Sequence, residues 1–124
     1  MYNNSPDYFG PGYWIAWHLK AYKANTYRKK AEASRSIVID VSNIPCEKCR
    51  KDALEYMRNN QLITSVENKK DELSLFKWTV LFHNFVNKKL GKEIITLEQA
   101  IELWNGNNVC LEEDCGGNIK IRGL

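Results

Sequence analysis

Apolar residues recur along this chain at intervals of three and four, the spacing of amphipathic helices, and almost no strand-like alternation precedes the C-terminal segment. The pattern predicts helices over residues 11–24, 27–42, 46–59, 71–90 and 96–104. The Gly-Pro-Gly turn at residues 10–12 would open the first helix, and the polar residues 61–70 would form a loop. We therefore expect an all-α fold, a four-helix bundle with a short fifth helix.

Capping residues support the ends of the last two helices. Gly91 would cap the fourth helix, and Thr96 with Gln99 forms a capping-box pattern ahead of the fifth, which ends near Trp104. The spacing also predicts two inward faces. They consist of Trp14, His18 and Ala21 in the first helix, and of Ala31, Ser34, Val38 and Val41 in the second.

The composition is that of one ordinary globular domain. The 124 residues are 44% hydrophobic and 27% charged, with a formal net charge of +3. We predict a helical domain over residues 1–105 and a flexible tail over 106–124, where turn residues and acids replace the helical pattern. The basic residues between positions 20 and 30 are expected to cover a solvated helix face rather than to bind nucleic acid. No apolar stretch is long enough to span a membrane.

A Cys-x-x-Cys pair, Cys46 and Cys49, lies at the predicted start of the third helix. This spacing lets the two sulfurs join in a disulfide, and a helix N-terminus lowers the pKa of the first thiol. The pair is therefore a candidate redox centre. A zinc knuckle, or half of two structural disulfides, would use the same residues.

The predicted fourth helix carries several polar residues along one stripe. His83 and Asn87 share this stripe, Asn84 lies beside it, and Lys89 and Lys92 follow at the C-terminal end. Buried without a partner, such a group costs about 1–3 kcal/mol. A flat heteroaromatic ligand with ring nitrogens, ribitol hydroxyls and phosphates would satisfy them. The alternative is that these side chains bond to each other and to the backbone.

Together with an N-terminal motif, these residues resemble the FAD-linked sulfhydryl oxidases of the Erv/Alr type. Three motifs carry the resemblance, over about residues 9–104. They are Gly-x-x-x-Trp-x-x-x-His at residues 10–18, Cys-x-x-Cys with the following basic residue Arg50, and His-Asn-x-Val-Asn-x-x-Leu-x-Lys at residues 83–92. Trp104, near the end of the predicted fifth helix, also has a counterpart in the family.

The resemblance implies FAD held non-covalently within the helical bundle of a homodimer. The first motif would lie along the flavin nucleotide, and the third would contact its adenine, ribose and pyrophosphate. The cofactor-binding residues implied in this way are Gly10, Trp14, His18, Cys49, His83, Asn84, Asn87, Lys89, Lys92 and Trp104.

The resemblance also implies the reaction, with Cys46 and Cys49 as the catalytic pair. Cys46 would exchange disulfides with a dithiol protein substrate, and Cys49, beside the flavin, would pass the electrons to FAD. O2 would then accept the electrons and leave as H2O2. The net product is a disulfide bond in the partner protein.

Two departures from the family pattern are visible. No cysteine occurs between Cys49 and Cys110, where many members have a structural pair, and Phe9 replaces the tryptophan that normally precedes Gly10. Cys110 and Cys115 lie in the predicted tail, where they would form either a shuttle between substrate and inner disulfide or a simple structural clasp.

The small size, the many Asn and Lys residues and the lost pair are most similar to members encoded by large DNA viruses that assemble in the cytoplasm. Such viruses must make disulfides against a reducing host cytosol. We therefore expect a setting in the host cytoplasm or the virion, with a thioredoxin-like or virion protein as substrate. The mitochondrial intermembrane space is the alternative, and no signal peptide is recognisable.

A structural zinc protein is the alternative function, with Cys46, Cys49, Cys110 and Cys115 as its four ligands. The C-x4-C spacing of the last two is unusual for a zinc knuckle, and residues 83–92 would stay unexplained, so we expect no metal. A thioredoxin-like reductase would need a βαβ setting that the helical pattern does not offer. A non-catalytic helical binding module is the third alternative.

Overall fold

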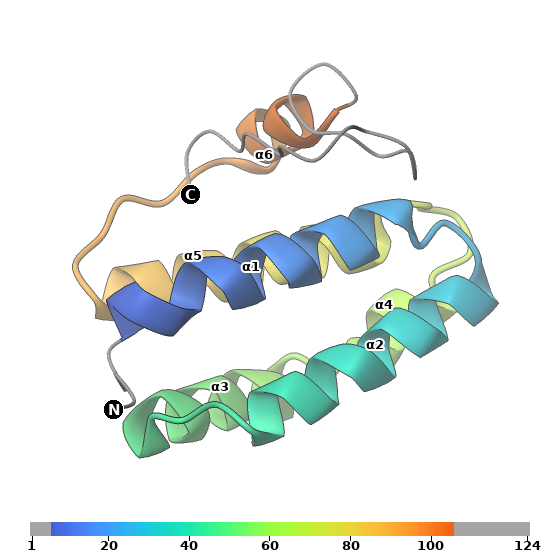
Figure 1. Cartoon of the computed structure of the whole chain (residues 1–124). Coiled ribbons are helices and arrows are strands. Elements are labelled where there is room, and N and C mark those ends of the chain that lie inside the picture. Colours follow the sequence, from blue (N-terminus) through green and yellow to red (C-terminus); the bar gives the residue numbers. More distant parts are fainter. Residues whose placement is uncertain (1–5, 106–124) are drawn as a thin grey trace, which may run out of the picture.

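The computed structural model describes residues 6–105, with side chains from Gly10 onward, and these residues form six α-helices (Figure 1). The helices are α1 (Pro6–Lys23), α2 (Tyr27–Ser42), α3 (Glu47–Asn59), α4 (Leu62–Glu67), α5 (Ser74–Lys89) and α6 (Leu97–Trp104). This part of the chain contains no strand, which confirms the predicted all-α class. None of these helices is long and apolar enough to cross a membrane. The predicted tail, residues 106–124, lies outside the described residues.

The four long helices form a bundle of two layers. Helices α1 and α5 lie side by side in one layer, and α2, α3 and the short α4 make up the other (Figure 1). Helix α5 packs against α1, α3, α4 and α6, and therefore lies at the centre of the fold. The predicted four-helix bundle is confirmed, and α6 is its predicted short additional helix.

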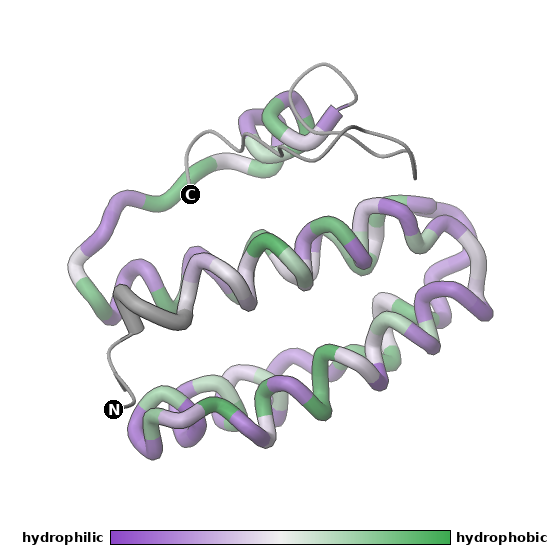
Figure 2. Tube along the Cα trace, in the orientation of Figure 1, coloured by the Kyte–Doolittle hydropathy of each residue, from purple (hydrophilic) through white to green (hydrophobic). Residues whose placement is uncertain are grey.

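Aromatic rings fill the space between the two layers. Trp17, Phe76 and Phe82 are almost completely buried, together with Ile37 and Leu75. Figure 2 shows the matching alternation of hydrophobic and hydrophilic positions along the helices. Burial of a side chain of this kind stabilises the fold by about 1.5–3 kcal/mol. The rings of α1 and α5 thus provide both the core and a rigid wall for the site.

Helix α1 begins earlier than predicted. Pro11 lies inside the helix, and neither Gly10 nor Gly12 has a positive φ, so the predicted Gly-Pro-Gly turn was wrong. Pro11 cannot donate a hydrogen bond to the preceding turn. Only one backbone bond is lost, whereas Trp17 and His18 further along the same helix are buried. Packing of the later turns therefore outweighs the local turn signal.

Helix α2 has the predicted bounds, and the predicted Val41 is buried, but the rest of the buried face differs. Its buried residues are Lys30, Ala33, Ile37 and Val41. Val38, predicted to face inward, is 42% exposed. Three consecutive β-branched residues at 37–39 fit either face by pattern alone, so tertiary contacts decide which one is buried. The Lys30 ammonium is satisfied by the carbonyl oxygens of Asn68 and Asp71, at 2.8 and 2.7 Å.

A short helix, α4, replaces the loop predicted for residues 61–70. Leu62 and Val66, one turn apart, are buried and pack this helix onto its neighbours. Most of the surrounding residues are polar, and the apolar Ile63 is 47% exposed. Two buried apolar residues are too few to give a periodic signal, so the sequence prediction was wrong here.

Helices α3, α5 and α6 agree with the prediction to within a few residues. Helix α5 begins at Ser74 rather than Asp71, because the Asp71 carboxylate accepts the Leu73 N–H at 3.0 Å in a turn ahead of the helix. Gly91 follows the end of α5 with a φ of +72°, a conformation that favours glycine. The capping box ahead of α6 is present.

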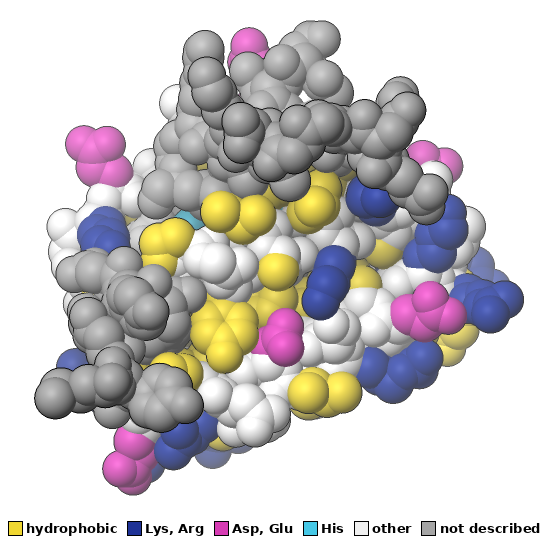
Figure 3. Space-filling model, in the orientation of Figure 1, with side chains coloured by type: hydrophobic (Ala, Val, Ile, Leu, Met, Phe, Trp, Pro, Cys, Tyr) yellow, Lys and Arg dark blue, Asp and Glu magenta, His cyan; other side chains and the backbone are white. Residues whose placement is uncertain are grey.

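One face of the molecule carries the basic cluster near residues 20–30. Figure 3 shows Lys and Arg side chains gathered at the end of the molecule where α1 leads into α2. Lys20, Lys23, Arg28 and Lys29 are exposed, as predicted for a solvated face. The buried Lys30 is the exception.

Candidate active site

The redox pair lies at the start of α3. Cys46 is the N-cap residue, and it is joined by a disulfide to Cys49, with the two Cα atoms 5.2 Å apart. The Cys46 sulfur accepts a hydrogen bond from the Cys49 backbone N–H at 3.2 Å. The Arg50 guanidinium donates to the Ile44 carbonyl oxygen at 2.6 Å and fixes the turn ahead of the pair. Both sulfurs are therefore held in the first turn of a helix, as the sequence predicted.

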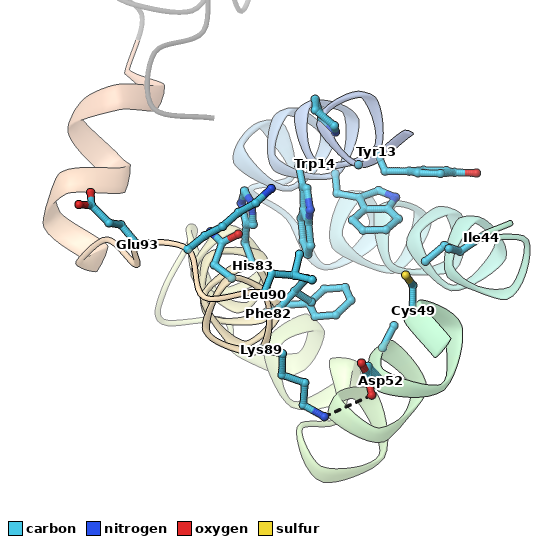
Figure 4. Close-up of a pocket in the computed structure, with 17 residues that line it drawn as sticks. Tyr13, Trp14, Ile44, Cys49, Asp52, Phe82, His83, Lys89, Leu90 and Glu93 are labelled. Atoms are coloured by element: carbon cyan, nitrogen blue, oxygen red, sulfur yellow. Dashed lines mark hydrogen bonds and ion pairs between the residues drawn. The ribbon is translucent and has the colours of Figure 1, made fainter. Parts of the chain in front are cut away.

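A cavity of about 280 Å³ opens beside Cys49 (Figure 4). Aromatic residues of α1 and α5, among them Trp14, Trp17 and Phe82, form its walls. Cys49 lines this cavity, whereas Cys46 is not among its lining residues. The two sulfurs of the pair therefore have different surroundings.

Trp14 provides the main flat surface of the cavity. Its ring stacks on the His83 imidazole with centroids 4.0 Å apart and planes 8° apart, and it meets Phe82 edge-on at 4.9 Å. Tyr13 stacks on Trp17 in the same wall, at 5.3 Å. A planar ligand would find several aromatic rings in this wall.

His18 and His83 form a buried pair between α1 and α5. His18 Nε2 lies 2.9 Å from His83 Nδ1, and His18 Nδ1 lies 2.9 Å from the Thr79 hydroxyl. Burial, with the nearby His83, lowers the pKa of His18 to about 3. Burial, with the positive charge of Lys92, lowers the pKa of His83 to about 4. Both imidazoles are therefore neutral at neutral pH.

Charged residues cover the rim of the cavity. The Lys89 ammonium lies 3.2 Å from an Asp52 oxygen and 3.4 Å from a Glu55 oxygen, and so connects α5 to α3 (Figure 4). The hydrogen bond to Asp52 raises the pKa of Lys89. The same ammonium lies over the Phe85 ring, 4.8 Å from the centroid. Lys92 lines the same cavity, so two cations lie close to its opening.

The predicted cofactor residues fall into two groups. The main cavity is lined by Gly10, Trp14, Cys49, His83, Asn87, Lys89 and Lys92. A smaller pocket of about 30 Å³ on the other side of His83 and Asn87 is lined by His18, Asn84 and Trp104. In that pocket the Asn84 amide donates to the Ile95 carbonyl oxygen at 2.8 Å and accepts the Ile95 N–H at 3.1 Å. Asn84 thus anchors the segment between α5 and α6.

Trp104 packs against the histidine pair from α6. Its buried ring meets the His18 imidazole edge-on, with centroids 5.4 Å apart. The Phe76 ring also meets this imidazole edge-on, at 6.0 Å. These contacts hold the His18 ring in place and separate it from solvent.

Several lining residues were missed by the sequence analysis. Asp52 follows Cys49 by one helical turn, on the same face of α3. That spacing could have indicated it. Ile44 could not be found this way, because only the fold brings the connection between α2 and α3 to the cavity.

The described residues offer little to a metal ion. Cys46 and Cys49 are joined in a disulfide, and residues 6–105 contain no group of three or more His, Cys, Asp or Glu residues that could hold a metal. Cys110 and Cys115, the other two ligands of the zinc alternative, lie outside the described residues.

The residues present fit FAD. Aromatic faces suit a flat ring system, the His83 and Asn87 side chains offer polar partners, and the cations Lys89 and Lys92 suit a pyrophosphate. A disulfide sulfur in the wall of the same cavity adds a group that can exchange electrons with a bound ring. The donor set is thus that of a dinucleotide site beside a redox-active disulfide.

Comparison with known proteins agrees with this assignment. The "FAD-linked sulfhydryl oxidase" of African swine fever virus (isolate Pig/Kenya/KEN-50/1950) is 37% identical over 92 residues, which cover 72% of this chain and 73% of the relative. The "Putative FAD-linked sulfhydryl oxidase 347L" of Invertebrate iridescent virus 6 is 31% identical over 112 residues, 84% of this chain and 98% of the relative. The pattern of the Erv1 / Alr family matches residues 11–105. The chain therefore belongs to the Erv1 / Alr family.

Proposed function

We propose that the Cys46–Cys49 disulfide is the redox centre through which the protein oxidises dithiols. As a member of its family, the protein is a FAD-dependent thiol oxidase that forms disulfides and passes electrons through FAD to O2, giving H2O2. The observation that carries the proposal is the position of Cys49 in the wall of the aromatic cavity. It supports different roles for the two sulfurs.

Cys46 exchanges with the substrate in this proposal. A substrate thiolate attacks the Cys46 sulfur, the disulfide breaks, and Cys49 leaves as a thiolate. The second substrate thiolate then attacks the substrate sulfur of the mixed disulfide and releases Cys46. The substrate has formed a disulfide, and its two electrons now reside on the Cys46 and Cys49 thiols. The N-cap position of Cys46 supports this role, because the start of a helix stabilises a thiolate.

Cys49 hands the electron pair onward. FAD, when bound, supplies a two-electron acceptor that O2 can reoxidise, with H2O2 as the product. The Cys49 thiolate must form before transfer, and it would lie in the first turn of α3, near the positive end of the helix dipole. Reformation of the Cys46–Cys49 disulfide completes the cycle.

Residues of both pockets would hold the cofactor. Trp14 offers a stacking face, and Lys89 and Lys92 offer positive charge for the phosphates. Asn87 and His83 line both pockets. Their side chains would form hydrogen bonds to the cofactor where the two pockets meet. The contacts carried over from the family to Gly10, His18, Asn84 and Trp104 belong to the same proposal.

The segment after residue 105 provides a second pair of thiols. Cys110 and Cys115 would act as a shuttle that receives electrons from a protein substrate and delivers them to Cys46. The residues between these two cysteines include three acids, Glu112 to Asp114, which distinguishes this pair from the Cys46–Cys49 pair. A structural clasp is the competing role.

The viral relatives suggest a setting in the host cytoplasm or the virion. We propose a homodimer that oxidises a thioredoxin-like or virion protein in that setting. A reducing cytosol would otherwise keep the thiols of such a substrate reduced, so its disulfides would need an oxidase of this kind. Sedimentation of the FAD-loaded protein at two concentrations tests the dimer directly.

The visible absorption spectrum during dithiothreitol addition tests the proposed redox centre. A bound flavin band should bleach under nitrogen and persist in air, with H2O2 produced in air. Cys49→Ser should keep the band but lose the bleaching, because no thiolate remains beside the cofactor. Ser42→Ala, at the exposed end of α2, serves as a neutral control. Bleaching at the parent rate in Cys49→Ser would overturn the assigned role.

Substitution of Cys110 and Cys115 by serine tests the shuttle. The double variant Cys110→Ser, Cys115→Ser should oxidise dithiothreitol at the parent rate and a reduced protein substrate more slowly. A small dithiol can reach Cys46 directly, so it serves as the internal control. Equal rates on the protein substrate would rule out the shuttle.

A further inference from the structure

A chain of hydrogen bonds connects the backbone of α5 to the cavity. The Thr79 hydroxyl lies 2.6 Å from the Phe76 carbonyl oxygen and 2.9 Å from His18 Nδ1. His18 Nε2 lies 2.9 Å from His83 Nδ1, and the His83 ring lines the cavity. Thr79 is completely buried and His18 is 2% exposed. The Thr79 hydroxyl and the His18 imidazole therefore depend on these partners.

The number of available hydrogens fixes the direction of the chain. The three contacts need one hydrogen each, and a neutral His18, a neutral His83 and the Thr79 hydroxyl supply three in total. Burial keeps both imidazoles neutral at neutral pH, since their pKa values are lowered to about 3 and about 4. If each of the three contacts is a hydrogen bond, all three hydrogens are used, one in each contact.

Only one arrangement meets this condition. The Phe76 carbonyl oxygen can only accept, so Thr79 must donate to it. The Thr79 oxygen must then accept from His18 Nδ1–H, which leaves His18 Nε2 as an acceptor. His83 must therefore donate through Nδ1–H, and its Nε2 carries a lone pair.

The reverse arrangement is disfavoured by geometry. If Thr79 donated to His18 instead, its oxygen and the Phe76 carbonyl oxygen would face each other at 2.6 Å without a hydrogen between them. A buried acceptor pair of this kind loses its hydrogen bond and its solvation. In that reverse arrangement His18 would donate to His83 through Nε2–H, and His83 would carry its own hydrogen on Nε2.

We propose that Thr79 is a positioning residue for the cofactor: acting through His18, it fixes His83 in the tautomer whose Nε2 is a hydrogen-bond acceptor. His83 then offers an acceptor to an N–H or O–H group of the bound nucleotide. Thr79 itself does not line the cavity. The proposal rests on the proposed function, because it assumes that FAD occupies the site lined by His83.

The tautomers can be observed directly in the full chain labelled with 15N-histidine. Two-bond 1H–15N spectra at neutral pH distinguish Nδ1–H from Nε2–H imidazoles, and only His18 and His83 contribute signals. We expect both to carry their hydrogen on Nδ1, without FAD and after FAD is added. A hydrogen on His83 Nε2 in the parent protein would overturn the proposal.

Two variants of Thr79 separate the hydroxyl from the shape of the side chain. Thr79→Val keeps the volume but removes the hydroxyl, so His18 Nδ1–H loses its acceptor and both imidazoles should move toward the Nε2–H tautomer. The dissociation constant of FAD, measured by fluorescence titration, should rise about tenfold with the loss of one hydrogen bond. Thr79→Ser keeps the hydroxyl and should retain the parent tautomers and affinity. Circular dichroism checks that each variant is folded.

The possible results separate this proposal from the proposed function. Unchanged tautomers in Thr79→Val would show that Thr79 does not control them, and changed tautomers with unchanged FAD affinity would show that the cofactor does not use them. Either result overturns the proposal while the oxidase activity stands. Failure of the parent protein to bind FAD would count against the proposed function itself, and the spectra would still report the hydrogen-bond chain.

Discussion

Among individual residues, the neutral histidine pair makes stability depend on pH. In the unfolded chain each imidazole has a pKa near 6.5, whereas in the folded protein it is lowered to about 3 for His18 and about 4 for His83. Between these values the unfolded chain binds more protons, so acid favours unfolding and stability is highest above pH 6.5. The free energy of unfolding should therefore fall by up to about 1.4 kcal/mol per pH unit for each histidine as the pH decreases toward about 4.5.

Urea unfolding at a series of pH values between about 7 and about 4.5 measures this dependence. His18→Gln should lower the slope by about half, because one of the two groups is removed. A free energy of unfolding that stays constant over this range in the parent protein would contradict the prediction.

The chemical groups of the site were easier to predict from the sequence than the groups that support them. The Cys46–Cys49 pair and His83 could be recognised because a redox pair and a buried polar stripe have characteristic spacings. Thr79 could not, because a threonine in an apolar helix segment resembles ordinary core. Its partner His18 comes from α1, and only the packed bundle brings the two together.

Among the helices, boundaries were predictable wherever a cap or a redox pair marked them. Helix α3 follows its N-cap Cys46 and α6 follows its capping box, as expected. The inward face of α2 was not predictable, because the β-branched residues 37–39 suit either side. Helix α4 was missed because two buried residues in a polar segment give no periodicity. Local signals thus identify ends more readily than buried faces.

Two neighbouring residues of α4 provide a matched test of its packing. Leu62 is 9% exposed and the adjacent Ile63 is 47% exposed. Leu62→Ala should lower the free energy of unfolding by about 2–5 kcal/mol, because it leaves a cavity between α4 and the bundle. Ile63→Ala should change it by less than about 0.5 kcal/mol. Urea unfolding of both variants decides the matter, and equal losses would mean that α4 does not pack as described.

In the assembled bundle, the cavity belongs to both layers. Trp14 comes from α1, Cys49 from α3 and His83 from α5, so the site forms only when these helices are packed together. The resemblance to the family grouped these three residues in one site, and the structure brings all three to one cavity. The sequence could not predict that His18, Asn84 and Trp104 would line a separate, smaller pocket.

A cofactor that contacts both layers should stabilise the fold as a unit. At an FAD concentration of about 100 times the dissociation constant, linkage adds about 2.7 kcal/mol, which corresponds to roughly 10 °C in the melting temperature of a domain of this size. Differential scanning fluorimetry with increasing FAD measures the shift. Trp14→Leu, which removes the stacking face, should show a smaller one. A melting temperature independent of FAD would contradict the proposed site.

The cap of α3 gives the oxidation state a local reporter. The Cys49 amide hydrogen bonds to the Cys46 sulfur, which is a weak acceptor in a disulfide and a strong one as a thiolate. Reduction should therefore protect this amide from exchange with deuterium, at a pH where Cys46 is ionised. The same backbone bond that starts the helix would then record how many electrons the pair holds, without any reference to flavin colour.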